Sequence, residues 1–188
     1  SSVTYYTGHG PWAPIMGVCY YRPVTPWSRG EYADANNTED DFAVGWRNGL
    51  VARTDDHGDS TATATPLPAS SPATTSGIIS TRSDKDVFAV STTCSATLTA
   101  SVAPAPRSPN LDVQLSLLSA TGAPLAISNP SAAYSTYDLA TGLNAATSTT
   151  VAPGTYYLEV DGVGADSPST GYSEYASLGQ YTITVSGC

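Results

Sequence analysis

Carboxylate side chains are concentrated in two short runs, DDHGD at residues 55–59 and DKD at residues 84–86. Carboxylate oxygens presented by glycine-containing loops are ligands that calcium takes in proteins. If the fold brings the two runs together, they can converge on one ion; otherwise they are simply solvated acids. Calcium is therefore the only cofactor that the sequence suggests. The candidate ligands are Asp55, Asp56, Asp59, Asp84 and Asp86, with Asp161, Asp166 and Glu174 as a weaker second group.

The sequence lacks the residue spacings of two common kinds of catalytic site, a zinc-binding histidine pair and a nucleophile elbow. The only histidines are His9 and His57, so no histidine pair at positions i and i+4 can hold zinc. A nucleophile elbow of the pattern G-x-S-x-G is also absent. We therefore expect a protein that is not an enzyme.

The residues from Ile78 onward carry strand patterns. The runs DVFAV, ATLTASV, LDVQLSLLS, TYYLEVDGV and QYTITVSG alternate apolar and polar residues between clusters of Gly, Pro, Asn and Ser. Short runs of this kind indicate a sandwich of antiparallel strands. In LDVQLSLLS every second residue is expected to face the core, namely Leu111, Val113, Leu115 and Leu117. Asp112, Gln114 and Ser116 are expected to face solvent.

Three regions differ in composition. Residues 1–54 form an aromatic-rich N-terminal segment with all three tryptophans, residues 55–77 form a Ser/Thr/Pro-rich lead-in or linker, and residues 78–188 form the expected sandwich. The first region favours extended and irregular structure because its prolines remove backbone donors. One short helix is expected after Thr38, which would be its N-cap, with Gly49 as its stop.

Charge and composition exclude several classes of partner. The chain has 188 residues, with 7 Lys and Arg against 16 Asp and Glu, and a formal net charge of −9. Such a surface repels phosphate backbones, so no nucleic acid partner is expected. No apolar run approaches the roughly 20 residues that a membrane span requires. Abundant hydroxylated residues with little lysine suggest an extracellular protein, secreted or on a cell surface, where disulfides persist.

The three cysteines predict one disulfide. Cys94 and Cys188 each end a strand-like run, and a bond between them would add about 4 kcal/mol in the chain-entropy model. Cys19 is then left over. We favour a buried free thiol for it, with an intermolecular bridge as the alternative.

Two kinds of glycosylation signal are present. Asn36-Asn37-Thr38 is an N-glycosylation sequon, and residues 60–76 are similar in composition to an O-glycosylated stalk. An unmodified spacer is the equally plain alternative. The candidate positions are Asn36, Thr61, Thr63, Thr65, Ser70, Ser71, Thr74 and Thr75.

Two stretches resemble parts of secreted bacterial peptidases. YYTGHGPWAPIMGVCYYRP, from Tyr5 to Pro23, resembles the methionine-turn region of reprolysin-like metzincins, although the zinc-binding H-E-x-x-H helix of that family is missing. GIISTRSDKDVFAV, NLDVQLSLLSATG and the segment from APGTYYLEVDG to the end resemble a pre-peptidase C-terminal (PPC) domain. The PPC resemblance implies a non-catalytic jelly-roll sandwich. His9 and Met16 would be remnants of a zinc-site environment, with Met16 as a core residue in a tight turn as the plain alternative.

The missing catalytic half leaves an aromatic surface that must be buried elsewhere. It can fold back on the sandwich or dock on another copy, and we predict docking that builds a filament or matrix. The residues predicted to mediate assembly are Tyr5, Tyr6, Trp12, Ile15, Met16, Tyr20, Tyr21 and Trp27. The expected partners are copies of the same chain, with glycans as a further candidate. The alternative function is a C-terminal attachment or stabilising fragment of a secreted zinc metallopeptidase.

Overall fold

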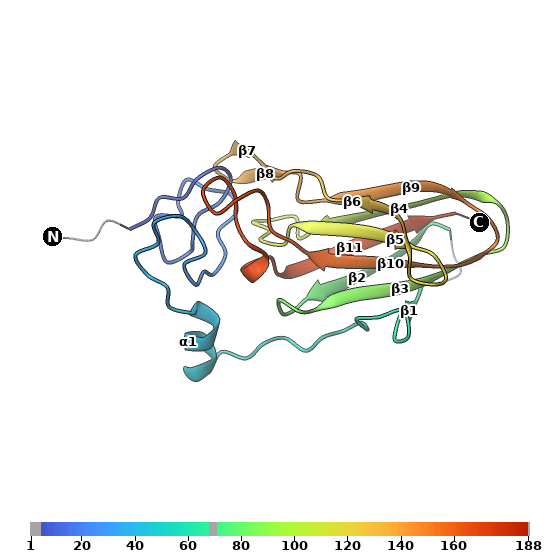
Figure 1. Ribbon diagram of the computed structural model, residues 1–188, viewed down its shortest axis with the longest axis horizontal. Helices are drawn as coiled ribbons and strands as arrows, with labels where there is room; N and C mark the ends of the chain where they lie inside the picture. The colour runs from blue at the N-terminus through green and yellow to red at the C-terminus, as the bar shows by residue number, and fades with distance from the viewer. Residues whose placement is uncertain (1–4, 68–70, 188) are drawn as a thin grey trace.

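The alternating runs of the C-terminal part build two stacked sheets (Figure 1). The structure is a computed structural model that describes residues 5–67 and 71–187. One sheet has the order β1-β3-β10-β5-β6 and the other has the order β2-β11-β4-β9. A third, two-stranded sheet consists of β7 and β8. The strands are β1 (Thr65–Pro66), β2 (Ala73–Ile79), β3 (Lys85–Thr92), β4 (Ala96–Pro104), β5 (Val113–Leu118), β6 (Pro124–Ser128), β7 (Ala133–Thr136), β8 (Leu139–Thr141), β9 (Ala145–Val151), β10 (Gly154–Gly162) and β11 (Gly179–Ser186).

This architecture confirms the predicted fold class, a mainly β antiparallel sandwich with an irregular N-terminal segment and one short helix. Every strand pair in the two large sheets is antiparallel except β1 with β3, which run parallel. The core lies between the sheets, where Phe88, Leu115, Leu158 and Ile183 are completely buried. Burying side chains of this size contributes roughly 1.5–3 kcal/mol each.

Residues 55–77, which were expected to be a lead-in or linker, contribute strands to the sandwich, so they do not form a separate linker. They supply β1 and most of β2. The first part of this stretch, residues 55–67, includes β1 and bridges the two sheets; we call it the lead-in. Asp56 accepts a hydrogen bond from the Ile78 amide of β2, and Gly58 accepts one from the Val87 amide of β3. This stretch is rich in Ser, Thr and Pro and has no alternation of apolar residues, so its sequence suggested a spacer. The stretch joins the sandwich largely through backbone hydrogen bonds, which its sequence pattern does not reveal.

His57 is the centre of this bridge. Its Nε2 lies 3.0 Å from the carbonyl oxygen of Ser76 in β2, its Nδ1 lies 3.1 Å from the Thr65 hydroxyl, and its ring packs edge-on against Phe88 of β3. One side chain therefore contacts both sheets and β1. The lead-in closes the open side of the sandwich, where β2 is the edge strand of one sheet and the two-residue β1 covers part of β3 at the edge of the other.

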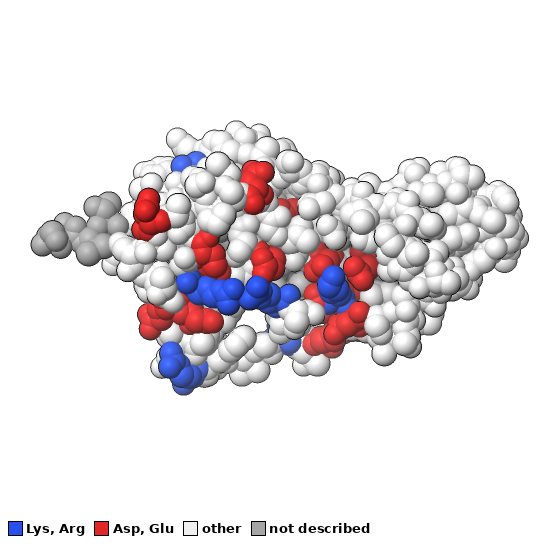
Figure 2. Space-filling view, viewed as in Figure 1, with Lys and Arg blue, Asp and Glu red and all other residues white. Residues whose placement is uncertain are grey.

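The two sheets differ in charge. The strands β2, β4, β9 and β11 contain no charged residue, and their outward positions are mostly Thr and Ser. The strands β3 and β10 instead carry Lys85, Asp86, Glu159 and Asp161. Charged side chains accordingly gather on one part of the face in Figure 2, and the right-hand end of that face carries none.

The N-terminal segment folds back onto one end of the sandwich. Trp12 and Val24 are buried against Leu143 and Tyr172, and Tyr6 and Tyr32 pack on this cluster in a stacked pair with ring centroids 4.4 Å apart. Trp12 and Tyr6 are thus internal contacts, not free assembly residues. Part of the aromatic surface therefore takes the first of the two predicted routes, burial within its own chain.

The helix is α1 (Asp41–Arg47), and its N-cap is Asp40 rather than Thr38. The Asp40 carboxylate accepts hydrogen bonds from the Ala43 amide at 2.8 Å and from the Tyr175 hydroxyl at 2.7 Å. The hydrogen bond from Tyr175 of the sandwich favours Asp40 over Thr38 as the N-cap, and the local sequence does not show this contact. Gly49, with φ of +97°, follows the C-cap Asn48, as a glycine stop should.

Two polar residues, one in β5 and one just before it, were expected to face solvent but are buried. Asp112 is 1% exposed and Ser116 is 4% exposed. Asp112 lies beneath the loop that contains Tyr172 and Ser177, both of which hydrogen-bond to it. In the strand register Ser116 lies opposite Glu159 of β10 and Ile127 of β6, both of which have larger side chains. The apolar residues of this run face the core as predicted.

Candidate functional site

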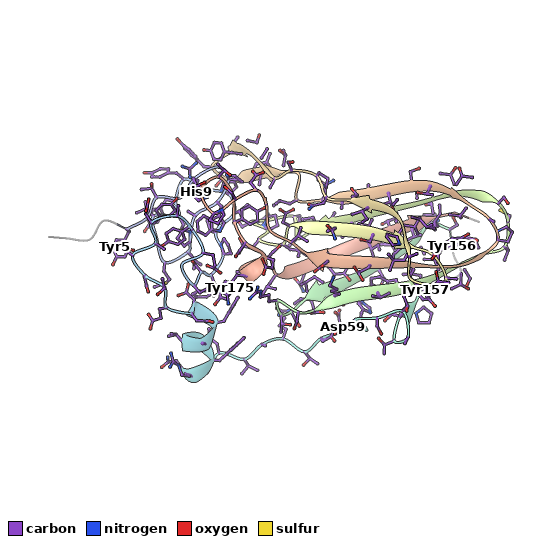
Figure 3. The ribbon with its side chains drawn as sticks, viewed as in Figure 1. Tyr5, His9, Asp59, Tyr156, Tyr157 and Tyr175 are labelled. Carbon is purple, nitrogen blue, oxygen red and sulfur yellow. The ribbon has the colours of Figure 1, made fainter. Side chains whose placement is uncertain are left out.

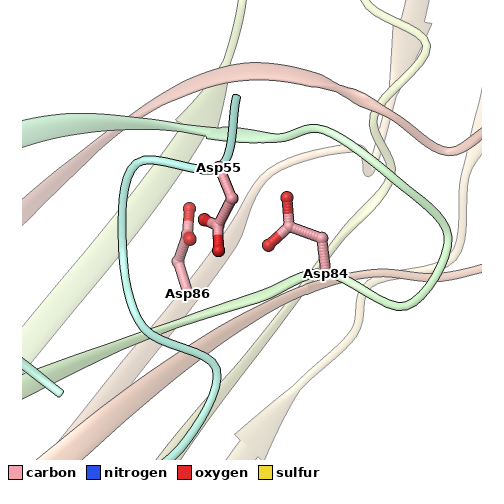
Figure 4. A group of neighbouring side chains, drawn as sticks. All are labelled: Asp55, Asp84 and Asp86. Atoms are coloured by element: carbon pink, nitrogen blue, oxygen red, sulfur yellow. The ribbon is translucent and has the colours of Figure 1, made fainter. Parts of the chain in front are cut away.

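The fold brings together three of the five predicted calcium ligands. Carboxylate oxygens of Asp55, Asp84 and Asp86 all lie within 4.8 Å of one another (Figure 4). Asp55 comes from the start of the lead-in, Asp84 from the turn before β3 and Asp86 from β3 itself. The site therefore lies where the lead-in crosses the edge of the sandwich.

Strand alternation places these acids and keeps the nearest lysine away from them. In β3, Asp86 is opposite Val160 in the register of β10 and faces the core, so Lys85 faces the other side. There the Lys85 ammonium pairs with Asp161 at 2.7 Å and with Glu159 at 3.5 Å. In the part of the chain that the structure describes, no lysine or arginine therefore forms an ion pair with the three clustered carboxylates.

Two of the three acids are buried with unused oxygens. Asp84 is 5% exposed and Asp86 is 0% exposed. One oxygen of each has a donor: Asp84 accepts from the Ser80 amide and Asp86 from the Tyr181 hydroxyl. The second oxygen of each, Oδ1, is buried without a hydrogen-bond partner. Leaving such an atom unsatisfied costs about 1–3 kcal/mol, and more when the group is charged, so a bound cation would offset a real penalty.

Burial and mutual repulsion favour the protonated acids. Burial is the largest cause of a raised pKa for Asp86, the Tyr181 hydroxyl opposes the shift and the nearby Asp84 carboxylate adds to it, and together they place this pKa at about 7. Burial also raises the pKa of Asp84. Three carboxylates this close need either protons or a cation. Calcium fits because it accepts six to eight oxygen ligands in flexible geometry, with backbone carbonyls and water completing the set.

Gly77 leaves space for the Tyr181 side chain, which donates a hydrogen bond to Asp86 in this site. It pairs with Tyr181 across β2 and β11, and a Cβ added at Gly77 would lie 2.3 Å from the Tyr181 hydroxyl oxygen and 2.8 Å from an Asp86 oxygen. Only glycine leaves the phenol space to reach Asp86. Sequence reasoning did not single out Gly77 or Tyr181, because their roles depend on cross-strand register.

The other predicted ligands lie elsewhere. Asp56 is committed to the Ile78 amide, and the exposed Asp59 is outside the cluster. The second predicted group does not converge, because Asp161 pairs with Lys85, Glu174 pairs with Arg82, and Asp166 is exposed in its own loop. Within residues 5–67 and 71–187, the three-aspartate cluster is the one group with metal-ligand geometry.

His9 and Met16 have structural surroundings in this chain. His9 contacts the Tyr6 hydroxyl through Nδ1 and the Gly171 carbonyl through Nε2 at 2.5 Å. Met16 lies in a tight turn in which the Gly17 amide donates to the Pro14 carbonyl, but its side chain is 64% exposed. The turn agrees with the plain alternative, whereas the core position does not.

An exposed apolar surface remains on the N-terminal segment. We define the N-terminal aromatic surface as the exposed side chains of Tyr5, Ile15, Met16, Tyr20 and Tyr21. Tyr20 is 81% exposed and Tyr5 is 70% exposed. Tyr5 and His9 lie at the opposite end of the molecule from Tyr156 and Tyr157 (Figure 3). Trp27, at 37% exposure, faces α1 instead, where its ring lies 6.4 Å from that of Phe42.

The β7–β8 hairpin extends this surface, which the sequence had not indicated. Tyr137 packs edge-on against Tyr21 with ring centroids 5.4 Å apart, and Tyr134 lies under the guanidinium of Arg22. Tyr134, Tyr137 and Leu139 are themselves exposed. Isolated aromatic residues in turns give no periodic signal, so only the fold reveals that they gather here.

The cysteine and glycosylation predictions are partly outside the described residues. Cys188 lies outside them, so the Cys94–Cys188 disulfide stays a prediction; Cys19 is a free, half-buried thiol. Ser70 also lies outside the described residues. Asn36, Thr61, Thr63, Ser71 and Thr74 are exposed. Thr65 contacts His57 through its hydroxyl, and Thr75 shares the core-facing side with Ile183, so both are less accessible to modification.

Comparison with known proteins gives limited information. No protein-family model matches the chain, and no curated protein matches it either. Among solved structures, the chain is similar to the pre-peptidase C-terminal domain of a collagenase from Bacillus anthracis, with 17% identity, a TM-score of 0.43, and coverage of 72% of this chain and 99% of that one. It is also similar to a periplasmic inhibitor of g-type lysozyme from Aeromonas hydrophila, with 13% identity, a TM-score of 0.43, and coverage of 66% and 95%. At these identities the likeness concerns the fold alone.

The described part of the chain, residues 5–67 and 71–187, has no helix that is long and apolar enough to cross a bilayer.

Proposed function

We propose that this chain is a non-catalytic extracellular structural protein that self-assembles into a filament or matrix through its N-terminal aromatic surface. The observation that carries the proposal is the exposure of Tyr5, Met16, Tyr20 and Tyr21 on a segment whose other aromatic residues are anchored to the sandwich. The anchored residues hold the surface in place, so docking does not first require ordering the segment.

Charge supports association between copies at this surface. Residues 5–30 contain two arginines and no acidic residue, in a chain with a net charge of −9. Two copies repel each other over most of their surface, and this segment is an exception. Exposed tyrosines also suit interfaces, because they contribute large contact area with little loss of side-chain freedom.

The test is electron microscopy and sedimentation of the full chain carrying Met16→Ser together with Tyr20→Ser. Both side chains are exposed, so the monomer should fold normally while assembly is lost. Val51→Ser is the matched control, because Val51 is 89% exposed and lies outside the surface. Assembly that survives the double substitution would contradict the proposal.

The descent of the N-terminal segment from a metzincin is part of this proposal and rests on the residue resemblance alone. A wild-type chain that stays monomeric at all concentrations would favour the alternative, an attachment or stabilising module of a secreted peptidase. In that case a zinc-binding H-E-x-x-H helix should be encoded upstream of this sequence.

We further propose that calcium bound by Asp55, Asp84 and Asp86 stabilises the sandwich. The ion would join the start of the lead-in to β3, at the buried oxygens that lack partners. A ligand at 100 times its Kd stabilises a protein by about 2.7 kcal/mol. Calcium should therefore raise the melting temperature relative to chelator.

Asp84→Asn should abolish the response to calcium, whereas Asp59→Asn, outside the cluster, should retain it. The readout is thermal unfolding followed by circular dichroism at a fixed pH of 7.5. An unchanged melting temperature at millimolar calcium, or an equal loss of response in both variants, would remove the site.

A further inference from the structure

The chain between α1 and the lead-in has no backbone partners. We define the connector as residues 51–54, with the sequence VART. Every residue from 46 to 56 is exposed, and the connector belongs to no helix or strand. Among the described residues, none forms a hydrogen bond with the backbone of the connector. Figure 1 shows this stretch running from α1 along the lower side of the molecule toward β1.

The connector also stands away from the sandwich. A cavity of about 430 Å³ is lined both by Val51 and Ala52 and by residues 80–82 of the turn before β3. Neither backbone pairing nor close packing therefore holds the connector in place. Exposed segments of this kind open most readily and are the preferred positions of proteolytic nicking.

Arg53 gives the connector a recognisable cleavage point. Trypsin-like endopeptidases bind the cationic side chain before the cleaved bond through an aspartate in their specificity pocket. Arg53 is exposed, and its guanidinium forms no ion pair or hydrogen bond with any other described residue. Thr54 follows it, so the amide of the bond after Arg53 is not a proline amide and is open to hydrolysis.

Four of the other basic residues lie on backbone with a fixed local structure. Arg47 is in α1 and Lys85 is in β3. Arg82 lies in the turn before β3. Arg107 precedes Ser108, whose positive φ of 45° marks a tight turn. An endopeptidase would have to open each of these places before it could bind the chain in an extended form.

The remaining two basic residues, Arg22 and Arg29, are half-buried in the N-terminal segment. The Arg22 guanidinium donates to the Gly10 carbonyl oxygen at 2.8 Å. The Arg29 amide donates to the Glu31 carboxylate at 2.8 Å. All seven basic residues lie in the described part of the chain, and Arg53 alone is exposed on a stretch without turn, bend or regular structure.

A cut in the connector would leave the two pieces in contact. Trp12 of the N-terminal segment is buried in a cluster with Tyr172 of the sandwich, and the Ala33 amide donates to the Pro168 carbonyl oxygen at 3.1 Å. The lead-in begins at Asp55, after the bond in question, so its hydrogen bonds to β2 and β3 stay within one piece. Each piece therefore keeps its own anchors.

We propose that the Arg53–Thr54 bond is a site at which a trypsin-like endopeptidase cleaves the folded protein, giving a two-chain form whose pieces stay together. The step is hydrolysis. The peptide C–N bond breaks and one water molecule is consumed, which leaves a carboxylate on Arg53 and an ammonium group on Thr54. This inference goes beyond the proposed function and depends on neither assembly nor calcium.

The test is limited digestion of the native full chain with trypsin at a fixed calcium concentration, followed by intact mass measurement. Residues 1–53 and 54–188 should appear first, and cleavage after any other basic residue should be slower by about tenfold or more, because the backbone there must open first. Arg53→Gln should remove the early cleavage and Arg53→Lys should restore it, because trypsin accepts either cation. Arg47→Gln, at an exposed position in the last turn of α1, is the matched control and should be cut like the wild type.

Gel filtration of the digested protein should give one peak at the wild-type position in native buffer, and the two pieces should separate in denaturant. Circular dichroism melts of the variants should match the wild type, so that a changed cleavage rate reports on the connector. First cleavage at another basic residue, an Arg53→Gln chain cut as fast as the wild type, or pieces that separate in native buffer would overturn the proposal. Assembly and the calcium response are measured on the uncut chain, so their failure is distinguishable from these outcomes.

Discussion

Replacing Asp112 with asparagine should stabilise the protein at neutral pH and have little effect in acid. Asp112 is 1% exposed. One of its oxygens accepts a hydrogen bond from the Tyr172 hydroxyl at 2.6 Å, and the other, Oδ1, is buried without a partner. Burial raises the pKa of Asp112 to about 6, although the Tyr172 hydrogen bond opposes the shift. Asparagine resembles the protonated acid and can still accept from Tyr172.

The sign follows from proton linkage. Well below the ordinary pKa of 3.8 the carboxyl is protonated in both the folded and the unfolded chain, and the native state has its full stability. As the pH rises, the unfolded chain loses its proton first, so stability falls until the pH passes the folded pKa of about 6. Because one pKa unit corresponds to about 1.4 kcal/mol, the shift from 3.8 to about 6 amounts to roughly 3 kcal/mol.

The assay is chemical and thermal unfolding of the wild type and Asp112→Asn from pH 4 to 7.5 at a fixed calcium concentration. The two proteins should differ little near pH 4. At pH 7.5 the variant should be more stable by about 3 kcal/mol, or roughly 6–12 °C for a chain of this size. Asp138→Asn removes an exposed carboxylate and is the control. A difference that does not change with pH, or a variant less stable at pH 7.5, would refute the reasoning.

Three further outcomes follow from the structure. Gly77→Ala should lower the melting temperature and weaken the calcium response, because its Cβ would lie 2.3 Å from the Tyr181 hydroxyl oxygen; unchanged melting with and without calcium would contradict this. Trp12→Ala should cost about 3–5 kcal/mol and release the N-terminal segment to proteases, whereas Trp46→Ala, at a 52% exposed position, should cost far less. Intact mass of natively purified protein should exceed the sequence mass if Asn36 or the lead-in threonines carry sugars, and an exact match would exclude them.

The sandwich was readable from the sequence because strand alternation is a local signal. The five predicted strand runs correspond to β3, β4, β5, β10 and β11. The short strands β6, β7 and β8 lack a clear period, and β2 was hidden in a stretch whose threonines suggested a linker. Asp112 shows the limit of alternation. The pattern gives the face on which a residue lies, but not whether a distant loop covers that face.

The candidate metal centre was predictable only as two separate runs. Each run had the composition of a calcium loop, but which acids converge depends on how the lead-in crosses β3. That crossing selects Asp55 and leaves Asp56 on the Ile78 amide and Asp59 exposed. The aromatic residues of the N-terminal segment likewise could not be sorted into buried and exposed ones from the sequence. Their total number indicated a sticky segment, while the packing of Trp12 and Tyr6 decided which of them remain available.

The bridging lead-in also determines where this molecule can be divided. A fragment that begins at Ile78 keeps most recognisable strand runs but lacks β1, most of β2 and the His57 contacts that join the two sheets. Such a fragment would expose Phe88 and the edges of both sheets to other chains. In gene fusion or recombination, the sandwich is therefore a transferable module only when it carries the acidic, threonine-rich stretch from Asp55 onward.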